Sequence, residues 1–108
     1  MSSPDFVGYI NDPDIHDGVI LKVQQSETKV RVLVRSYESQ LYAFEFDLVQ
    51  SVKSVEPEGM MLYSLTEMPA PPPFRRFVFT NWDEDGKGML EVVAQEIRTR
   101  KIANEATF

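Results

Sequence analysis

His16 is the only histidine of the chain, and Asp17 follows it directly. An imidazole ionises near neutral pH, so His16 could act as a general base, with Asp14 or Asp17 beside it. The sequence offers neither a nucleophile nor an oxyanion donor for such a site. We therefore assign no catalytic residue, and expect His16 and Asp17 to bind backbone groups or a ligand where the chain enters its first strand.

A second group of polar side chains lies in an acidic loop. An EF-hand needs oxygen ligands at positions one, three and five, a glycine at six and a bidentate glutamate at twelve. Asn81, Asp83, Asp85 and Gly86 match the first four of these positions, but Val92 occupies the twelfth. The segment predicts an acidic hairpin tip. Whether residues 83–88 bind a cation stays open, and we predict no metal site and no cofactor.

Trp82 adjoins this loop, and Tyr37 and Tyr63 are further aromatic residues outside the predicted core pattern. Exposed aromatic side chains carry much of the energy of protein interfaces, so an aromatic beside acidic residues can anchor a partner. The candidate binding residues are therefore His16, Asp17, Trp82, Asp83 and Asp85.

Composition limits the class of protein and the kinds of partner. The chain has 108 residues, 43% of them hydrophobic and 26% charged, which fits one globular domain over residues 1–108. Its net charge of -6 makes a nucleic-acid partner unlikely, because phosphate binding relies on clustered Lys and Arg. The absence of cysteine, of a basic leader and of a membrane-length apolar stretch predicts a cytoplasmic protein.

Two segments in which apolar and polar residues alternate are expected to form the scaffold that positions the candidate binding residues. Apolar side chains recur at every second position of Lys29–Arg35 and Tyr42–Leu48, which predicts antiparallel strands with one buried face. Outward cations of the first run are expected opposite outward acids of the second. The side chains predicted to share the buried face are Val30, Val32, Val34, Tyr42, Phe44, Phe46 and Leu48.

The whole chain predicts a mainly β fold, a single antiparallel sheet domain of about six or seven strands with little helix. A curved sheet, a sandwich and a partly open barrel all fit. Residues 1–17 are expected to be an irregular lead-in with a turn of helix around Phe6–Ile10, 68–74 a proline-rich loop, and 103–108 a frayed tail. Residues 89–102 fit a strand better than a helix, and α+β with a C-terminal helix is the alternative.

The order of the predicted segments along the chain resembles that of small uncharacterised bacterial antiparallel β domains, including immunity-like proteins of polymorphic toxin systems. The matching segments are the Ile15-His16-Asp17 lead-in, Val30–Val34, Phe44–Phe46 leading to Val49 and Val52, and Leu90–Val92. The resemblance implies an antiparallel β domain that binds protein, and no catalytic residue.

We expect a non-enzymatic protein-interaction domain of the immunity or adaptor type, whose acidity suits a basic partner. A small-ligand binding module, which needs a polar-lined cavity, and an enzyme using His16 are the alternatives. The sheet edges of a small antiparallel domain also raise the expectation of a homodimer.

Overall fold

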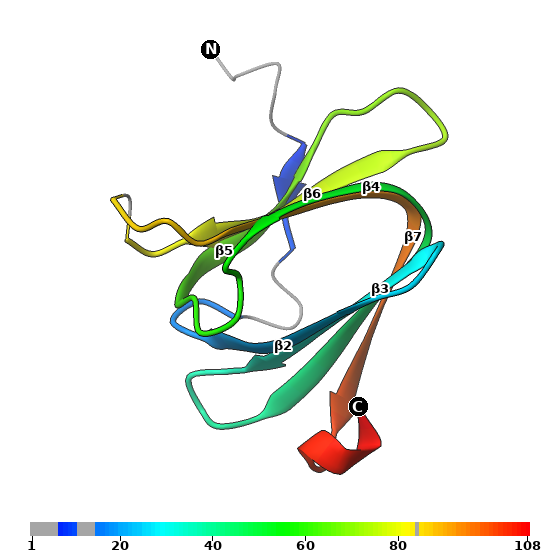
Figure 1. Cartoon of the computed structure of the whole chain (residues 1–108). Helices are drawn as coiled ribbons and strands as arrows, with labels where there is room; N and C mark the ends of the chain where they lie inside the picture. The colour runs from blue at the N-terminus through cyan, green and yellow to red at the C-terminus, as the bar shows by residue number, and fades with distance from the viewer. Residues whose placement is uncertain (1–6, 11–14, 84) are drawn as a thin grey trace.

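The computed structural model describes residues 7–10, 15–83 and 85–108, in which seven strands form one antiparallel sheet (Figure 1). This confirms the predicted mainly β fold. The described residues contain no α-helix, and therefore none long and apolar enough to cross a membrane. The order across the sheet is β1-β5-β6-β7-β4-β3-β2. The strands are β1 (Gly8–Tyr9), β2 (Val19–Gln25), β3 (Lys29–Arg35), β4 (Leu41–Val55), β5 (Leu62–Met68), β6 (Arg75–Asn81) and β7 (Met89–Ile102).

Two long strands, β4 and β7, give the sheet its curvature. They pair from Leu41↔Ile102 to Val55↔Met89, with a register shift between Val49 and Ser51. A β-bulge of this kind bends a strand and increases its twist. In Figure 1 both strands pass through the bend together, with β2 and β3 on one side of it and β5 and β6 on the other. The chain therefore forms a curled sheet whose two halves face each other.

The buried face of the sheet follows the predicted alternation with one exception. Val30, Val32, Phe44 and Phe46 are fully buried, as expected. Leu48 was predicted to join them and is instead 49% exposed, with φ 55°. A left-handed residue interrupts the regular alternation of a strand, so Val49 packs against the core in its place.

Four buried phenylalanines pack between the two halves of the curled sheet. We call them the core phenylalanines: Phe44, Phe46, Phe77 and Phe79. The ring centroids of Phe46 lie 5.3 Å from Phe77 and 6.1 Å from Phe79, and Phe44 lies 5.8 Å from Phe79. Offset and edge-to-face aromatic pairs each add about 0.5–1.5 kcal/mol beyond the burial of their area. These contacts hold β4 against β6, although β7 separates the two strands in the sheet order.

The outward charges of β3 and β4 pair in the predicted register. Lys29 lies opposite Asp47 and Arg31 opposite Glu45, with closest nitrogen–oxygen distances of 3.5 and 3.3 Å. Arg35, the third outward cation of β3, lies opposite Leu41 instead. The confirmed pairs belong to the surface of the sheet and explain its register.

The lead-in does not form the predicted turn of helix where the structure describes it. Gly8 and Tyr9 form β1 and pair with Glu67 and Thr66 of β5; Phe6 lies outside the described residues. The edge of β5 offers unpaired backbone groups, and pairing with them outweighs the near-helical spacing of the apolar residues.

The two ends of the sheet approach each other where β2 begins. The amide of Ile20 donates to the carbonyl of Met60 at 3.0 Å, and that of Leu62 donates to the carbonyl of Gly18 at 2.7 Å. Beyond the single bridge between Val19 and Met61, these segments form no ladder. The sheet is therefore curled and not closed into a barrel, and a gap remains beside the second half of β2.

The C-terminal residues 103–108, predicted to fray, contain a 3-10 turn, η1 (Glu105–Thr107). After it, Phe108 packs against a small apolar cluster of Leu33, Ala43 and Ile102. The guanidinium carbon of Arg31 lies 4.6 Å from the centroid of the Phe108 ring. Residues 69–74 form the loop between β5 and β6, with a cis bond between Pro72 and Pro73.

Candidate functional site

Three rings from distant parts of the chain form an aromatic cluster on the surface: His16, Tyr63 and Trp82. The rings of Tyr63 and Trp82 are stacked, with centroids 5.9 Å apart and planes inclined by 21°. His16 meets Tyr63 edge-on at 5.4 Å and lies 6.1 Å from Trp82. Tyr63 and Trp82 are 43% and 50% exposed. The structure thus brings together His16, Asp17 and Trp82 of the predicted binding residues.

His16 and Asp17 are positioned by the tight turn that precedes β2. The amide of Gly18 donates to the carbonyl of Ile15 at 2.8 Å, and Asp17 adopts φ 64°. A Cβ at position 18 would lie 2.9 Å from the carbonyl oxygens of Arg35 and Ile15, so only glycine fits there. The turn therefore directs His16 and Asp17 outward from the end of the sheet.

Tyr63 owes its position to a β-bulge. The pairing of β5 with β6 shifts register between Leu62 and Ser64, which leaves Tyr63 as the extra residue. Bulges redirect side chains and occur often beside functional sites. The amide of Trp82, the residue after β6, donates to the carbonyl of Met61 at 2.9 Å, which places its ring beside that of Tyr63.

A hydrogen bond to the backbone positions the ring of His16. Its Nδ1 lies 2.7 Å from the carbonyl oxygen of Tyr63, and a carbonyl only accepts, so Nδ1 carries a proton. Its Nε2 lies 3.6 Å from Oδ1 of Asp17. Both ring nitrogens thus face acceptors. The hydrogen bond to the carbonyl of Tyr63 therefore holds the ring in position against that residue.

Two grooves run beside Tyr63. The first, of about 340 Å³, has Ile10, Ile15 and His16 among its lining residues. The second, also about 340 Å³, has Met68 and Val78 in its lining. Tyr9 and Tyr63 line both grooves, so the aromatic cluster is continuous with an apolar surface over β1, β5 and β6.

The acidic loop is organised by its own hydrogen bonds. The amide of Asp83 donates to Oδ1 of Asn81 at 2.8 Å, and the amide of Asp85 donates to Oδ1 of Asp83 at 3.0 Å. The Nδ2 of Asn81 donates to the carbonyl of Gly88 at 3.1 Å. Asn81 and Asp83 therefore brace the turn. Within 7–10, 15–83 and 85–108, no three His, Asp or Glu side chains are grouped to hold a metal ion.

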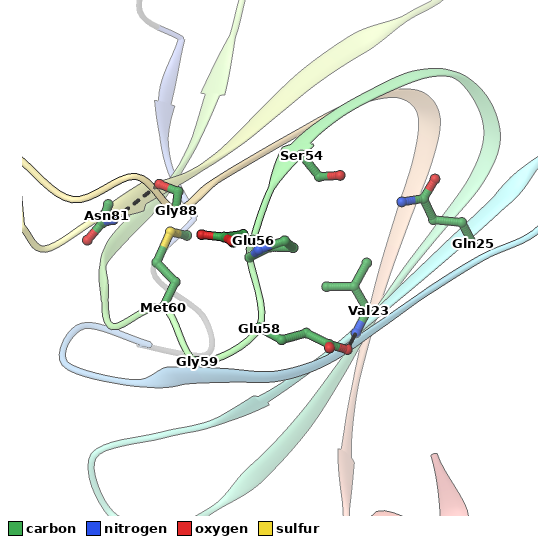
Figure 2. Close-up of a pocket in the computed structure, with 10 residues that line it drawn as sticks. Val23, Gln25, Ser54, Glu56, Glu58, Gly59, Met60, Asn81 and Gly88 are labelled. Carbon is green, nitrogen blue, oxygen red and sulfur yellow. Dashed lines mark hydrogen bonds between the residues drawn. The ribbon is translucent and has the colours of Figure 1, made fainter.

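A hollow of about 770 Å³ lies at the gap where the sheet does not close (Figure 2). Gln25, Ser54 and Glu56 line it, and Glu58 reaches across to β2, where its Oε2 accepts from the amide of Val23 at 2.9 Å. The lining is mixed polar and apolar. Sequence reasoning missed this hollow, because residues 57–59 have the composition of an ordinary turn and the gap depends on the curvature of the whole sheet.

Glu67 and Arg75 form the best-defined ion pair near the grooves. Nε of Arg75 donates to Oε2 of Glu67 at 2.9 Å, and Nη2 donates to Oε1 at 2.7 Å. The hydrogen bonds to Glu67 raise the pKa of Arg75 above its usual value. Because the pKa of Arg75 is raised, its guanidinium stays charged throughout the neutral range. The contact therefore links β5 to β6 and is no switch near neutral pH.

Tyr37, the other aromatic residue singled out in the sequence, is highly exposed in the turn between β3 and β4 and lies outside the aromatic cluster. Tyr63 could be recognised as an aromatic worth attention, but its partners are 47 residues before it and 19 residues after it in the sequence.

Comparison with known proteins gives no relative for this chain. No protein-family model, curated protein or solved structure matches it.

Proposed function

We propose that the chain is a non-enzymatic protein-interaction domain, of the immunity or adaptor type, which contacts its partner through the aromatic cluster. The observation that carries this proposal is the exposed stack of Tyr63 and Trp82, with His16 held edge-on against it. Large aromatic side chains supply much contact area and lose little conformational entropy on binding, which is why they dominate interface energies.

The backbone around the cluster supports a binding role because it is already in place. The bulge at Tyr63, the tight turn before Gly18 and the hydrogen bond from Trp82 to Met61 each fix one ring on the sheet. A surface fixed before binding avoids part of the entropic cost of association. The same devices also keep apolar rings at the surface, where burial in the core would have stabilised the fold more.

The charge of the chain supports a basic partner. The net charge is -6, and in the sequence Asp17 directly follows His16 and Asp83 directly follows Trp82. Complementary charge speeds diffusional encounter and disfavours partners of the wrong sign.

The test is affinity purification from native cells with three forms of the full chain: wild type, Trp82→Ala and Leu48→Ala. Leu48 is the matched control, because it is as exposed as Trp82 (49% against 50%) and lies on β4. We expect a protein that co-purifies with wild type and Leu48→Ala and is lost with Trp82→Ala. Its affinity is then measured by calorimetry with both purified proteins. Equal capture by all three forms would refute the proposal.

The hollow of Figure 2 favours a second candidate function, the binding of a small polar ligand. Its volume of about 770 Å³ falls in the range of small-molecule sites, and Gln25, Ser54 and Glu56 offer polar groups. A small molecule that co-purifies with wild type and is lost with the double variant Gln25→Leu and Ser54→Ala would support this role. A ligand-free protein by native mass spectrometry would count against it.

A further inference from the structure

We propose that the partner presents an arginine to the aromatic cluster, with its guanidinium stacked on Trp82 and paired with the carboxylate of Asp17. This inference rests on the proposed function and adds the chemistry of the contact. Three features carry it: the near-parallel rings, the carboxylate beside them and the grooves next to Tyr63.

The stack of Tyr63 and Trp82 can be extended by one more flat group. The two planes differ by only 21°. A guanidinium is planar and weakly hydrated, and Trp is the best of the aromatic rings for binding a cation. Within the described residues an arginine lies over a phenylalanine ring in the same way, with Arg31 4.6 Å from the Phe108 centroid and Arg75 5.0 Å from the Phe77 centroid.

Asp17 provides the opposite charge at the edge of the cluster. Its side chain is 41% exposed, and its Oδ1 lies 3.6 Å from Nε2 of His16. At 3.6 Å this separation is longer than a hydrogen bond, so Asp17 keeps accepting capacity for a ligand. The carboxylate can therefore accept two parallel hydrogen bonds from a guanidinium.

The charges around the cluster favour a cation more broadly. The chain has a net charge of -6, and Asp17 and Asp83 directly follow His16 and Trp82 in the sequence. Lysine would also be attracted, but its ammonium is a compact, strongly hydrated point charge that cannot stack or bind a carboxylate through a planar fork. The grooves beside Tyr63 can take apolar side chains that neighbour the arginine.

Trp82 is the single tryptophan, so its fluorescence reports on the cluster directly. The experiment titrates the full chain with tetra-arginine, tetra-lysine and tetra-citrulline peptides. We expect a saturable change with tetra-arginine, about tenfold weaker binding of tetra-lysine, and no binding of the uncharged tetra-citrulline. Absence of a saturable change with tetra-arginine, or equal binding of the two cationic peptides, would overturn the inference.

Two variants locate the contact. Asp17→Asn should weaken tetra-arginine binding about tenfold, because it removes a charge-assisted pair, and asparagine tolerates the φ of 64° at this position. Glu27→Gln removes the same charge in the turn at the far end of β2 and should leave binding unchanged. Equal weakening by both variants would show attraction to net charge alone and would also overturn the inference.

The proposed function and this inference can fail separately. If Trp82→Ala loses the purified partner while tetra-arginine does not bind wild type, the cluster is a protein-binding surface and the arginine contact is wrong. If tetra-arginine binds as expected while Trp82→Ala keeps its partner, the arginine site exists and the proposed interface is wrong.

Discussion

At the scale of residues, the placement of a side chain here depends on single backbone irregularities. Tyr63 reaches the surface as the extra residue of a bulge, and Leu48 leaves the core because of its positive φ. Neither can be read from the alternation of apolar residues, which assumes a regular strand. The exposure of Tyr63 in the candidate site and the wrong prediction of Leu48 as a core residue therefore both come from local irregularities of the backbone.

Leu48 gives the first prediction. A non-glycine residue in the left-handed region costs about 1–2 kcal/mol, and asparagine tolerates this region better than leucine. Because Leu48 is half exposed, Leu48→Asn should raise the free energy of unfolding by about 0.5–1 kcal/mol, measured by urea denaturation. A loss of more than about 1 kcal/mol would mean that Leu48 packs in the core, as its place in the alternation suggests.

Phe46 gives the second prediction. Its side chain is fully buried and contacts the rings of Phe77 and Phe79. Phe46→Ala should lower the free energy of unfolding by about 3–5 kcal/mol, through lost burial and the cavity that it leaves. Tyr37→Ala, on an exposed turn, is the control and should change stability by less than about 0.5 kcal/mol. Similar effects of the two substitutions would contradict the packing of the core phenylalanines.

At the scale of elements, the period-two pattern predicted the central strands, and the charge pattern predicted the register of β3 against β4. The pairing of β1 with β5 was not predictable, because it depends on which edge the curled sheet leaves open. The choice of strand for residues 89–102 is explained by β-branched Val92 and Val93 and by pairing with β4 along nearly all of β7. The local pattern of residues thus predicts where strands form, and long-range pairing decides which strands become neighbours in the sheet.

Glu58 provides a prediction about the edge of β2. Its carboxylate accepts from the amide of Val23, in place of a neighbouring strand. A hydrogen bond to a charged group is worth about 1.5–3 kcal/mol, so Glu58→Ala should speed amide exchange at Val23 by about tenfold or more, measured by NMR. The amide of Val32, in the interior of the sheet, is the control. Unchanged exchange at Val23 would contradict the contact.

The same edge bears on the predicted homodimer. Residues 59–62 and Glu58 cover part of β2, so two copies that pair through this edge would have to use the part of β2 beyond Val23. If this edge mediates association, Glu58→Ala should increase the dimer fraction in analytical ultracentrifugation. A wild-type and variant protein that are both monomeric at high concentration would refute the homodimer.

At the scale of the whole molecule, the fold is a curled sheet with an aromatic cluster on its surface and a hollow of mixed polar and apolar lining at its gap. The aromatic cluster joins the bulge of β5 and the end of β6, which are paired in the sheet, with the turn before β2, which reaches them only because the sheet curls. His16, Asp17 and Trp82 could therefore be predicted as binding residues from their chemical type. That they lie beside Tyr63 could not be predicted, because it depends on the topology of the sheet. The grooves and the hollow likewise belong to the assembled sheet.

The most direct test of the central claim compares stability and binding in one variant, Trp82→Ala. Because Trp82 is half exposed, its removal should change the free energy of unfolding by less than about 1 kcal/mol. Calorimetry with the purified partner should show a loss of about 2 kcal/mol or more, a weakening of roughly 30-fold, as for other interface hot spots. A variant that binds its partner as wild type does, or that loses binding only because it unfolds, would contradict the claim that the aromatic cluster is the binding surface.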